Sequence, residues 1–199
     1  MKAAVIGIAV ALHSLAASAR TARDVKGSTP PVAIQNDAKG DTMKRVLITG
    51  AGTGFGHEAA MRLAEKGFDV IATVEIWAQV QTLKRQAAAR GVSLKVEKLD
   101  VTNEGDRKKA LAWDVEILVN NAGVLEGGSV LDIPGANMRH QFEVNVIGPL
   151  LLTQGIAKQM VKRGKGRIVW VSSREGLNTN PFTGIYSASK HAARRSRRR

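Results

Sequence analysis

Short apolar runs alternate with amphipathic segments along the chain from residue 43 onward. The apolar runs predict strands at residues 46–49, 69–73, 92–96 continuing to 100, 116–120 and 167–172. Apolar residues at helical spacing predict helices at residues 57–66, 77–90, just after 102, and from about 136 to 163. This alternation is typical of a doubly wound parallel sheet with helices on both faces, an α/β/α sandwich. Right-handed crossovers then predict the strand order 3-2-1-4-5.

The composition is that of one soluble globular domain. The chain has 199 residues, of which 44% are hydrophobic and 24% are charged, and a chain of this length forms a single core. It contains no cysteine, which excludes disulfides, thiolate catalysis and cysteine-ligated zinc. The histidines are scattered without ligand-like spacing, so we predict no metal site; they are His13, His57, His140 and His191.

The net charge is +13, and five arginines of this excess lie in the last six residues, because residues 194–199 are arginine except for Ser196. The remaining positive charge is spread along the chain, so the domain itself is only mildly basic. We therefore do not expect a nucleic-acid partner. A basic binding module that uses the tail at 194–199 remains an alternative.

The first 42 residues differ in pattern from the rest of the chain. Residues 1–19 have the features of a secretory signal, with Lys2, an apolar run at 3–15 and a possible cleavage site at 17–19. That run is too short for a membrane span. Residues 20–42 contain proline, glycine and aspartate and are predicted to be a linker. We expect Met43 to be the functional start and 1–42 to be an upstream extension; a working signal peptide is the alternative.

A glycine cluster, residues 49–56 with the sequence TGAGTGFG, lies between the first predicted strand and helix. Its glycines can adopt positive φ and let backbone amides approach a pyrophosphate at the positive end of the following helix. A plain tight turn would have a similar composition. The spacing T-G-x-x-x-G-x-G resembles that of the short-chain dehydrogenase/reductase family.

Further motifs of that family follow in the same order along the chain. Asp100-Val101 ends the third predicted strand, the N-N-A-G motif at 120–123 ends the fourth, and Asn145 lies on the long helix. Ser173 ends the fifth strand, and the Y-x-x-x-K motif spans 186–190. The resemblance implies a Rossmann-like fold that transfers a hydride between NAD(P)(H) and a small carbonyl or alcohol substrate. It covers residues 43–193.

The resemblance assigns four catalytic residues. Tyr186 is the only tyrosine in the chain, and Lys190 lies on the same face of a helix four residues later. A nearby ammonium lowers the pKa of a phenol, so we expect Tyr186 to act as general acid or base. By resemblance, Ser173 orients the substrate oxygen, Lys190 also holds the nicotinamide ribose, and Asn145 positions a water that passes protons to Lys190.

The resemblance also assigns the cofactor contacts. Asp100 and Val101 are expected against the adenine ring, and the segment 121–123 along the cofactor channel. The second strand is expected to end at Thr73, where NAD-dependent members usually have aspartate, and Glu75 would repel a 2′-phosphate, so NAD is favoured over NADP. The cofactor-binding residues are expected to be Gly50, Thr53, Gly54, Phe55, Gly56, Glu75, Asp100, Val101, Asn121, Ala122, Gly123, Tyr186 and Lys190.

Members of the family usually continue well beyond the catalytic lysine, with two more strands and substrate-binding elements. We therefore expect 43–193 to be an incomplete domain in which the C-terminal strands are missing, with an exposed sheet edge and a marginal last helix. A truncated nucleotide-binding fragment with little or no activity is the alternative to an active enzyme. A homo-oligomer is expected for a full-length relative rather than for this chain. A nicotinamide cofactor favours a cytoplasmic location over export.

Overall fold

A computed structural model describes residues 44–196. The predicted signal-like segment, the linker and the last three arginines lie outside the described residues. The strands are β1 (Arg45–Ile48), β2 (Asp69–Val74), β3 (Lys95–Lys98), β4 (Ile117–Asn120) and β5 (Arg167–Trp170). The α-helices are α1 (Gly54–Glu65), α2 (Trp77–Ala89), α3 (Glu104–Ala110), α4 (Gly135–Phe142), α5 (Gly148–Arg163) and α6 (Gly184–Ser196). Three shorter helical turns are η1 (Leu111–Trp113), η2 (Glu143–Ile147) and η3 (Arg174–Gly176).

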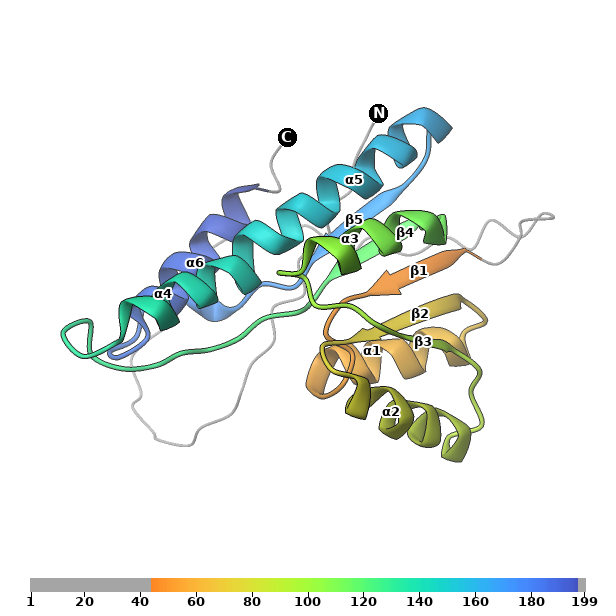
Figure 1. Cartoon of the computed structure of the whole chain (residues 1–199), viewed down its shortest axis with the longest axis horizontal. Helices are drawn as coiled ribbons and strands as arrows, with labels where there is room; N and C mark the ends of the chain where they lie inside the picture. The colour runs from red at the N-terminus through yellow and green to blue at the C-terminus, as the bar shows by residue number, and fades with distance from the viewer. Residues whose placement is uncertain (1–43, 197–199) are drawn as a thin grey trace, which may run out of the picture.

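The five strands form one parallel sheet in the order β3-β2-β1-β4-β5, as the sequence predicts. Helices α1 and α2 lie on one side of this sheet, and α3 and α5 on the other (Figure 1). Helix α6 packs against the α4–α5 side, where it contacts α4, η2 and η3. The domain is therefore a Rossmann-like α/β/α sandwich.

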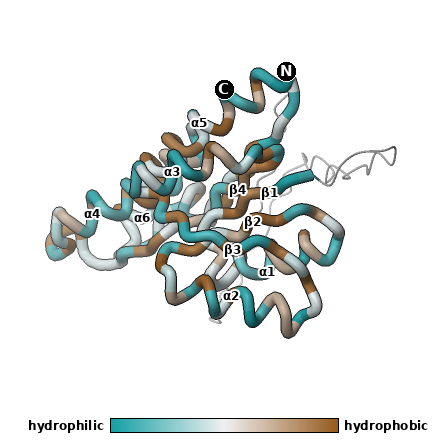
Figure 2. The backbone as a smooth tube through the Cα atoms, turned by 45° about the vertical axis from the view of Figure 1, so that its right-hand side comes forward, coloured by the Kyte–Doolittle hydropathy of each residue, from teal (hydrophilic) through white to brown (hydrophobic). Residues whose placement is uncertain are grey.

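Alternate residues of β1 divide the apolar core into two layers. Val46 and Ile48 pack toward α1 and α2, whereas Leu47 packs toward α3 and α5, and all three are fully buried. Figure 2 shows the brown, apolar stretches concentrated along the central strands and the inner faces of the helices. Burying one such side chain contributes about 1.5–3 kcal/mol, so strand β1 is a main contributor to the stability of both layers.

The long helix predicted over 136–163 is interrupted by a π-helical turn, η2, between α4 and α5. Pro149 has no backbone N–H to donate, and the amide of Gly148 instead bonds the Glu143 carbonyl five residues earlier. Gly148 also lets the helix approach the end of β3, because a Cβ there would lie 2.5 Å from the Val101 carbonyl oxygen. The π turn buries Asn145, which lies within it.

Several predicted boundaries were wrong by one to three residues, and the following differences affect the site. The third strand begins at Lys95 rather than at residue 92, because the amide of Val92 still bonds the Ala87 carbonyl at the end of α2. The first helix begins at Gly54, inside the glycine cluster. The second strand continues to Val74, and Thr73 is buried with its hydroxyl donating to the Ile48 carbonyl, 3.0 Å away.

Candidate functional site

The residues expected to act together lie at one edge of the sheet. All five strands are parallel, so the segments that follow them meet at the carboxyl edge, where doubly wound folds bind ligands. The glycine cluster follows β1, and Glu75 is the first residue after β2, where it is exposed. Asp100 follows β3, Asn121 follows β4, and Ser173 follows β5. The structure therefore brings five chain segments to a common edge.

The glycine cluster adopts a conformation that other residues would not tolerate. Gly50 and Gly54 have φ of 66° and 60°, which glycine adopts without a steric penalty. A Cβ on Gly50 would lie 2.7 Å from the Ala122 Cα, and a Cβ on Gly56 would lie 2.3 Å from the Asn121 side-chain nitrogen. The cluster is thus packed directly against the segment that follows β4.

Asn121 holds this contact with its side-chain amide. Its Nδ2 donates to the carbonyls of Thr49 and Gly50, both at 2.9 Å. The Thr49 hydroxyl oxygen in turn accepts the amides of Asn121 and Ala122, each at 3.0 Å. Asn121 and Ala122 therefore fix the shape of the glycine cluster.

The N-terminus of α1 opens at this edge. Its N-cap residue, Thr53, makes no side-chain capping bond and is exposed, as is Phe55. The first backbone amides of a helix have no partner within the helix, and they carry partial positive charge. Together with the close approach at Gly50 and Gly56, this end of α1 has the features of a phosphate cradle.

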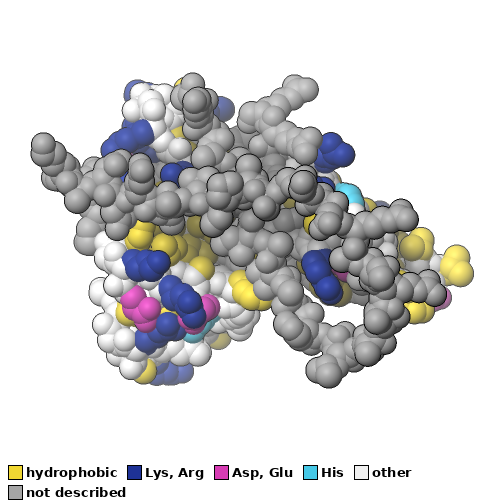
Figure 3. Space-filling model, turned by 180° about the vertical axis from the view of Figure 1, so that it is seen from behind, with side chains coloured by type: hydrophobic (Ala, Val, Ile, Leu, Met, Phe, Trp, Pro, Cys, Tyr) yellow, Lys and Arg dark blue, Asp and Glu magenta, His cyan; other side chains and the backbone are white. Residues whose placement is uncertain are grey.

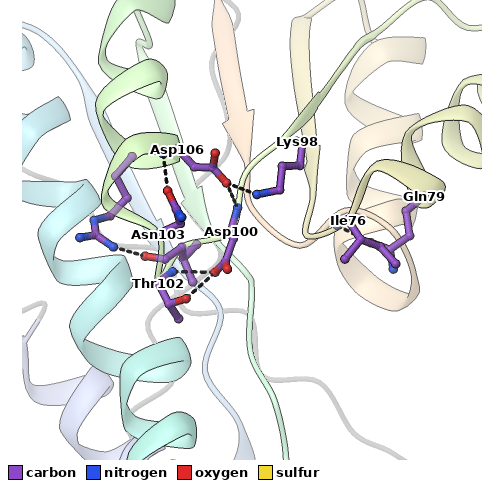
Figure 4. Close-up of polar contacts among 9 residues, drawn as sticks. Ile76, Gln79, Lys98, Asp100, Thr102, Asn103 and Asp106 are labelled. Carbon is purple, nitrogen blue, oxygen red and sulfur yellow. Dashed lines mark hydrogen bonds and ion pairs between the residues drawn. The ribbon is translucent and has the colours of Figure 1, made fainter.

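A second polar cluster surrounds Asp100 (Figure 4). The Asp100 Oδ1 accepts the Thr102 amide at 2.8 Å and the Thr102 hydroxyl at 2.7 Å. The Asp106 carboxylate accepts the Lys98 ammonium at 2.6 Å and the Asp100 amide at 2.9 Å. Although burial alone would raise it, the pKa of Asp106 is lowered below its ordinary value by these two bonds. Asp106 therefore remains ionised and fixes the turn at Asp100.

Gln79 and Asp106 are site residues that the motifs did not identify. The Gln79 side chain lies against Gly52, and a Cβ on Gly52 would be 3.2 Å from it. The Gln79 side-chain oxygen accepts the Ile76 amide at 3.5 Å. Figure 4 shows Ile76 and Gln79 on the α2 side, apart from the Asp100 cluster.

Asn103 caps α3 by accepting the Asp106 amide at 3.0 Å. An asparagine followed three residues later by an acidic residue is a capping signal that could have indicated Asp106.

Asn145, Gly123 and Lys190 form the inner part of the site. The Asn145 amide accepts the Val124 N–H and donates to the Val124 carbonyl, both at 2.9 Å, and it donates to the Ser189 hydroxyl at 3.0 Å. A Cβ on Gly123 would lie 3.1 Å from Asn145 Oδ1 and 3.2 Å from Lys190 Nζ. Asn145 thus connects the segment after β4 to α6, beside the buried Lys190.

The electrostatics of the Tyr186–Lys190 pair differ from the expectation. Burial raises the pKa of Tyr186 above its ordinary value, hydrogen bonding by Ser173 lowers it, and the negative charge of Glu175 raises it further. Burial lowers the pKa of Lys190, whose Nζ is 5.6 Å from the centre of the Tyr186 ring. The net shift of the Tyr186 pKa is therefore upward, because desolvation of the phenol is its largest cause.

Residues 44–196 contain neither a candidate metal site nor a candidate membrane-spanning helix. No group of three or more histidine, aspartate or glutamate side chains is arranged there to hold a metal ion. No helix in the described part of the chain combines the length and the apolar character that crossing a membrane requires.

Comparison with known proteins gives a consistent set of matches. The sequence profile described as "short chain dehydrogenase" matches residues 44–198. The chain is 40% identical over 157 residues to an uncharacterized oxidoreductase, YusZ, of Bacillus subtilis, and the match covers 75% of this chain and 55% of that protein. It is 35% identical over 156 residues to retinol dehydrogenase 8 of Homo sapiens, with 75% of this chain and 50% of that protein covered. The chain thus spans about half the length of these relatives.

A solved structure of an actinorhodin polyketide ketoreductase with NADPH is similar to the fold described above. Its TM-score is 0.72 at 30% sequence identity, and the match covers 75% of this chain and 60% of the ketoreductase chain.

Proposed function

Because the chain belongs to the short-chain dehydrogenase family of oxidoreductases, we propose that it transfers a hydride between a nicotinamide cofactor and a small carbonyl or alcohol. The observation that carries the proposal is the placement of Tyr186, Lys190 and Ser173 at the same sheet edge as the glycine cluster. Ser173 is close enough to the Tyr186 phenol to lower its pKa, and buried Lys190 is near both Tyr186 and Gly123.

The residues present fit a dinucleotide. Gly54 is open, with no atom within 4 Å of the position that a Cβ would take, and the open N-terminus of α1 would hold the pyrophosphate. Asp100 and Val101 would line the adenine side, with Glu75 near the adenosine ribose. Lys190, next to Gly123, would hold the nicotinamide ribose. When bound, the nicotinamide supplies the hydride for reduction or accepts it in oxidation.

The protein would contribute proton transfer and orientation. In reduction, the Tyr186 hydroxyl donates its proton to the substrate oxygen, and the Ser173 hydroxyl hydrogen-bonds the same oxygen. In oxidation, the Tyr186 phenolate removes the proton from the alcohol. Since the pKa of Tyr186 is raised above its ordinary value of 10.0, the phenol is protonated at neutral pH. The chain therefore favours reduction near neutral pH, and oxidation should increase as the solution becomes more alkaline.

The direct test measures cofactor binding and turnover with the 199-residue chain. We expect NADH fluorescence to increase on binding, and NADH absorbance to decrease when a panel of small ketones and aldehydes is added. The rate of reduction should stay level through neutral pH and fall only at alkaline pH, where the phenol loses its proton. A folded chain that gives neither a fluorescence change nor turnover would refute the proposal. Binding without turnover on any substrate would refute its catalytic part alone.

A second prediction concerns the choice of cofactor. Glu75 is exposed at the end of β2, and two unit charges 4 Å apart in water interact by about 1 kcal/mol. We therefore expect NADH to bind more tightly than NADPH. The substitution Glu75→Gln should improve the NADPH affinity by about fivefold and leave NADH little changed. Fluorescence titration of both cofactors measures the two constants.

The control for this prediction is Glu104→Gln, which removes an equally exposed carboxylate that pairs with Lys108. It should leave the ratio of the two affinities unchanged. Tighter binding of NADPH than of NADH by the unaltered chain would show that Glu75 does not set the preference. The pKa of Lys98 is raised mainly by its hydrogen bond to Asp106, and the charge of Glu75 adds a smaller contribution.

The α1–α2 side of the domain does not extend the basic surface that the basic-module alternative assigns to the tail at 194–199. On the α1–α2 side, acidic and basic side chains alternate in ion pairs that join Glu58 to Arg62 and Arg90, and Arg90 to Glu65. Figure 3 shows magenta and dark blue side chains intermixed on the face that it draws. Nucleic-acid binding requires cations that accumulate on one surface, and these cations are already paired with carboxylates.

A further inference from the structure

Glu175 is a buried carboxylate that the hydride-transfer mechanism does not use. It lies in η3, between Ser173 and the helix that contains Tyr186, and only 9% of its surface is exposed. Burying a charged group in this way is costly unless hydrogen bonds replace its water. Its surroundings should therefore explain why this position holds a glutamate.

Four hydrogen bonds from the chain satisfy this carboxylate. Its Oε2 accepts the Ser187 hydroxyl at 2.8 Å, the Thr183 hydroxyl at 2.8 Å and the Asn180 backbone amide at 3.2 Å. Its Oε1 accepts the side-chain amide of Asn180. These bonds lower the pKa of Glu175 although burial opposes the change, so the carboxylate is ionised at neutral pH.

The partners of Glu175 flank the start of α6. Thr183 immediately precedes this helix, and Ser187 lies in its first turn, next to Tyr186. An anion at this end of a helix also interacts favourably with the partial positive charge of the first amides. The carboxylate therefore fixes the helical turn that contains Tyr186.

The backbone of Glu175 holds the other catalytic hydroxyl. Its N–H donates to the Ser173 Oγ at 3.2 Å, and the Gly176 amide donates to the Ser173 carbonyl at 3.0 Å. One residue thus contacts Ser173 through its main chain and the first turn of α6 through its side chain. A substitution at this position removes the attachment to α6 and leaves the backbone contact with Ser173 in place.

We propose that Glu175 is a positioning residue, which keeps the Ser173 hydroxyl and the Tyr186 phenol in register by joining η3 to the first turn of α6. Its importance for catalysis rests on the function proposed above, whereas its effect on the two side chains does not. No motif of the sequence marks this role, because it depends on a turn that brings residues 180, 183 and 187 around one carboxylate.

Glu175 is also the charged neighbour that most directly affects Tyr186. The charged or titratable groups on the elements that contact α6 are Arg139 and His140 on α4, Glu143 on η2, and Arg174 and Glu175 on η3. Among these, Glu175 alone is buried and the others are exposed. On α6 itself Lys190 lies beside the ring. The ionisation of Tyr186 should therefore report changes at Glu175.

The test uses the fact that Tyr186 is the only tyrosine in the chain. Its phenolate absorbance in the near ultraviolet gives one titration curve without interference from other tyrosines, and the measurement needs neither cofactor nor substrate. Four proteins form a double-mutant cycle, namely the unaltered chain, Ser173→Ala, Glu175→Ala and the double variant. Circular dichroism at each pH confirms that the fold persists.

In the unaltered background, Ser173→Ala should raise the titration midpoint of Tyr186, because the Ser173 hydrogen bond favours the phenolate. With Glu175→Ala, the carboxylate no longer joins η3 to the first turn of α6, so Ser173 and Tyr186 lose their register, and the shift caused by Ser173→Ala should at least halve. Glu175→Gln retains an acceptor for the two hydroxyls and should preserve most of that shift. The titration midpoint of Tyr186 in the Glu175→Gln variant should be lower than in the unaltered chain, because the negative charge of Glu175 is lost. Glu116→Gln, at the opposite end of the sheet, should change neither quantity.

An equal Ser173→Ala shift with and without Glu175 would overturn the proposal. If Glu175→Ala does not fold, Thr183→Val replaces it in the cycle, because it removes one hydroxyl from the carboxylate and keeps the side-chain shape. An undiminished shift in that background would overturn the proposal equally. A chain without turnover would refute the enzymatic function and leave this result valid, whereas normal turnover with no coupling would refute the positioning role alone.

Discussion

Replacing Tyr186 by phenylalanine is expected to lower the rate of carbonyl reduction by about 100- to 10,000-fold, the contribution of a general acid. The ring itself should keep its place, because Tyr186 is half-buried and phenylalanine retains all of its carbon atoms. NADH affinity should therefore change little. A loss confined to kcat is the signature of a group that acts only in the transition state.

The measurement combines NADH fluorescence titration with steady-state reduction of the best ketone or aldehyde from the panel. Ser196→Ala is the matched control, since it removes an exposed hydroxyl from the same helix, where it bonds only the Ala192 carbonyl. It should retain the full rate. Comparable rates for Tyr186→Phe and the unaltered chain would show that another group transfers the proton.

The sheet could be predicted because its signals are local. Val46, Leu47 and Ile48 form an uninterrupted apolar run, which a strand buried on both faces requires, and the structure places these residues in two core layers. The strand order follows from the handedness of crossovers and not from any one residue. The π turn at Asn145 was not predictable from periodicity, because it depends on Pro149 and on the close approach of Gly148 to Val101.

The candidate site was predictable only where a motif marks it. The glycine cluster, Asn121 and Ser173 follow strands that the pattern located, and Asn145 lies within the predicted long helix. The contacts of Asp106 and Glu175 depend on side chains that loops bring together, for which the sequence has no periodic signal. The direction of the Tyr186 pKa shift depends on burial, and burial is a property of the packed structure. Spacing alone indicated the partner Lys190 but not the size of its desolvation.

A substitution of Lys190 is expected to reduce both cofactor binding and turnover, because this residue adjoins both the proposed ribose position and the phenol of Tyr186. The residue is 7% exposed, and its Nζ is 5.6 Å from the centre of the Tyr186 ring. Burial lowers the pKa of this ammonium, so the unfolded chain binds the proton more readily than the folded chain does. Between the pKa of Lys190 in the folded chain and its pKa in the unfolded chain, the free energy of unfolding should rise with pH. Below the pKa in the folded chain, the cost of burying the ammonium is fully present.

The substitution Lys190→Met is therefore expected to weaken catalysis and to spare the fold. Methionine fills a similar volume without a buried charge, so the melting temperature should not fall, and the dependence of stability on alkaline pH should diminish. NADH affinity should fall by about tenfold through the lost ribose contact, and turnover should fall by more than in Tyr186→Phe, because both the phenol and the cofactor lose a neighbour. Lys158→Met, an exposed lysine on α5, is the control and should behave like the unaltered chain. A folded Lys190→Met variant that binds NADH as tightly as the unaltered chain would show that Lys190 does not hold the ribose, and retained turnover would exclude it from the proton-transfer site as well.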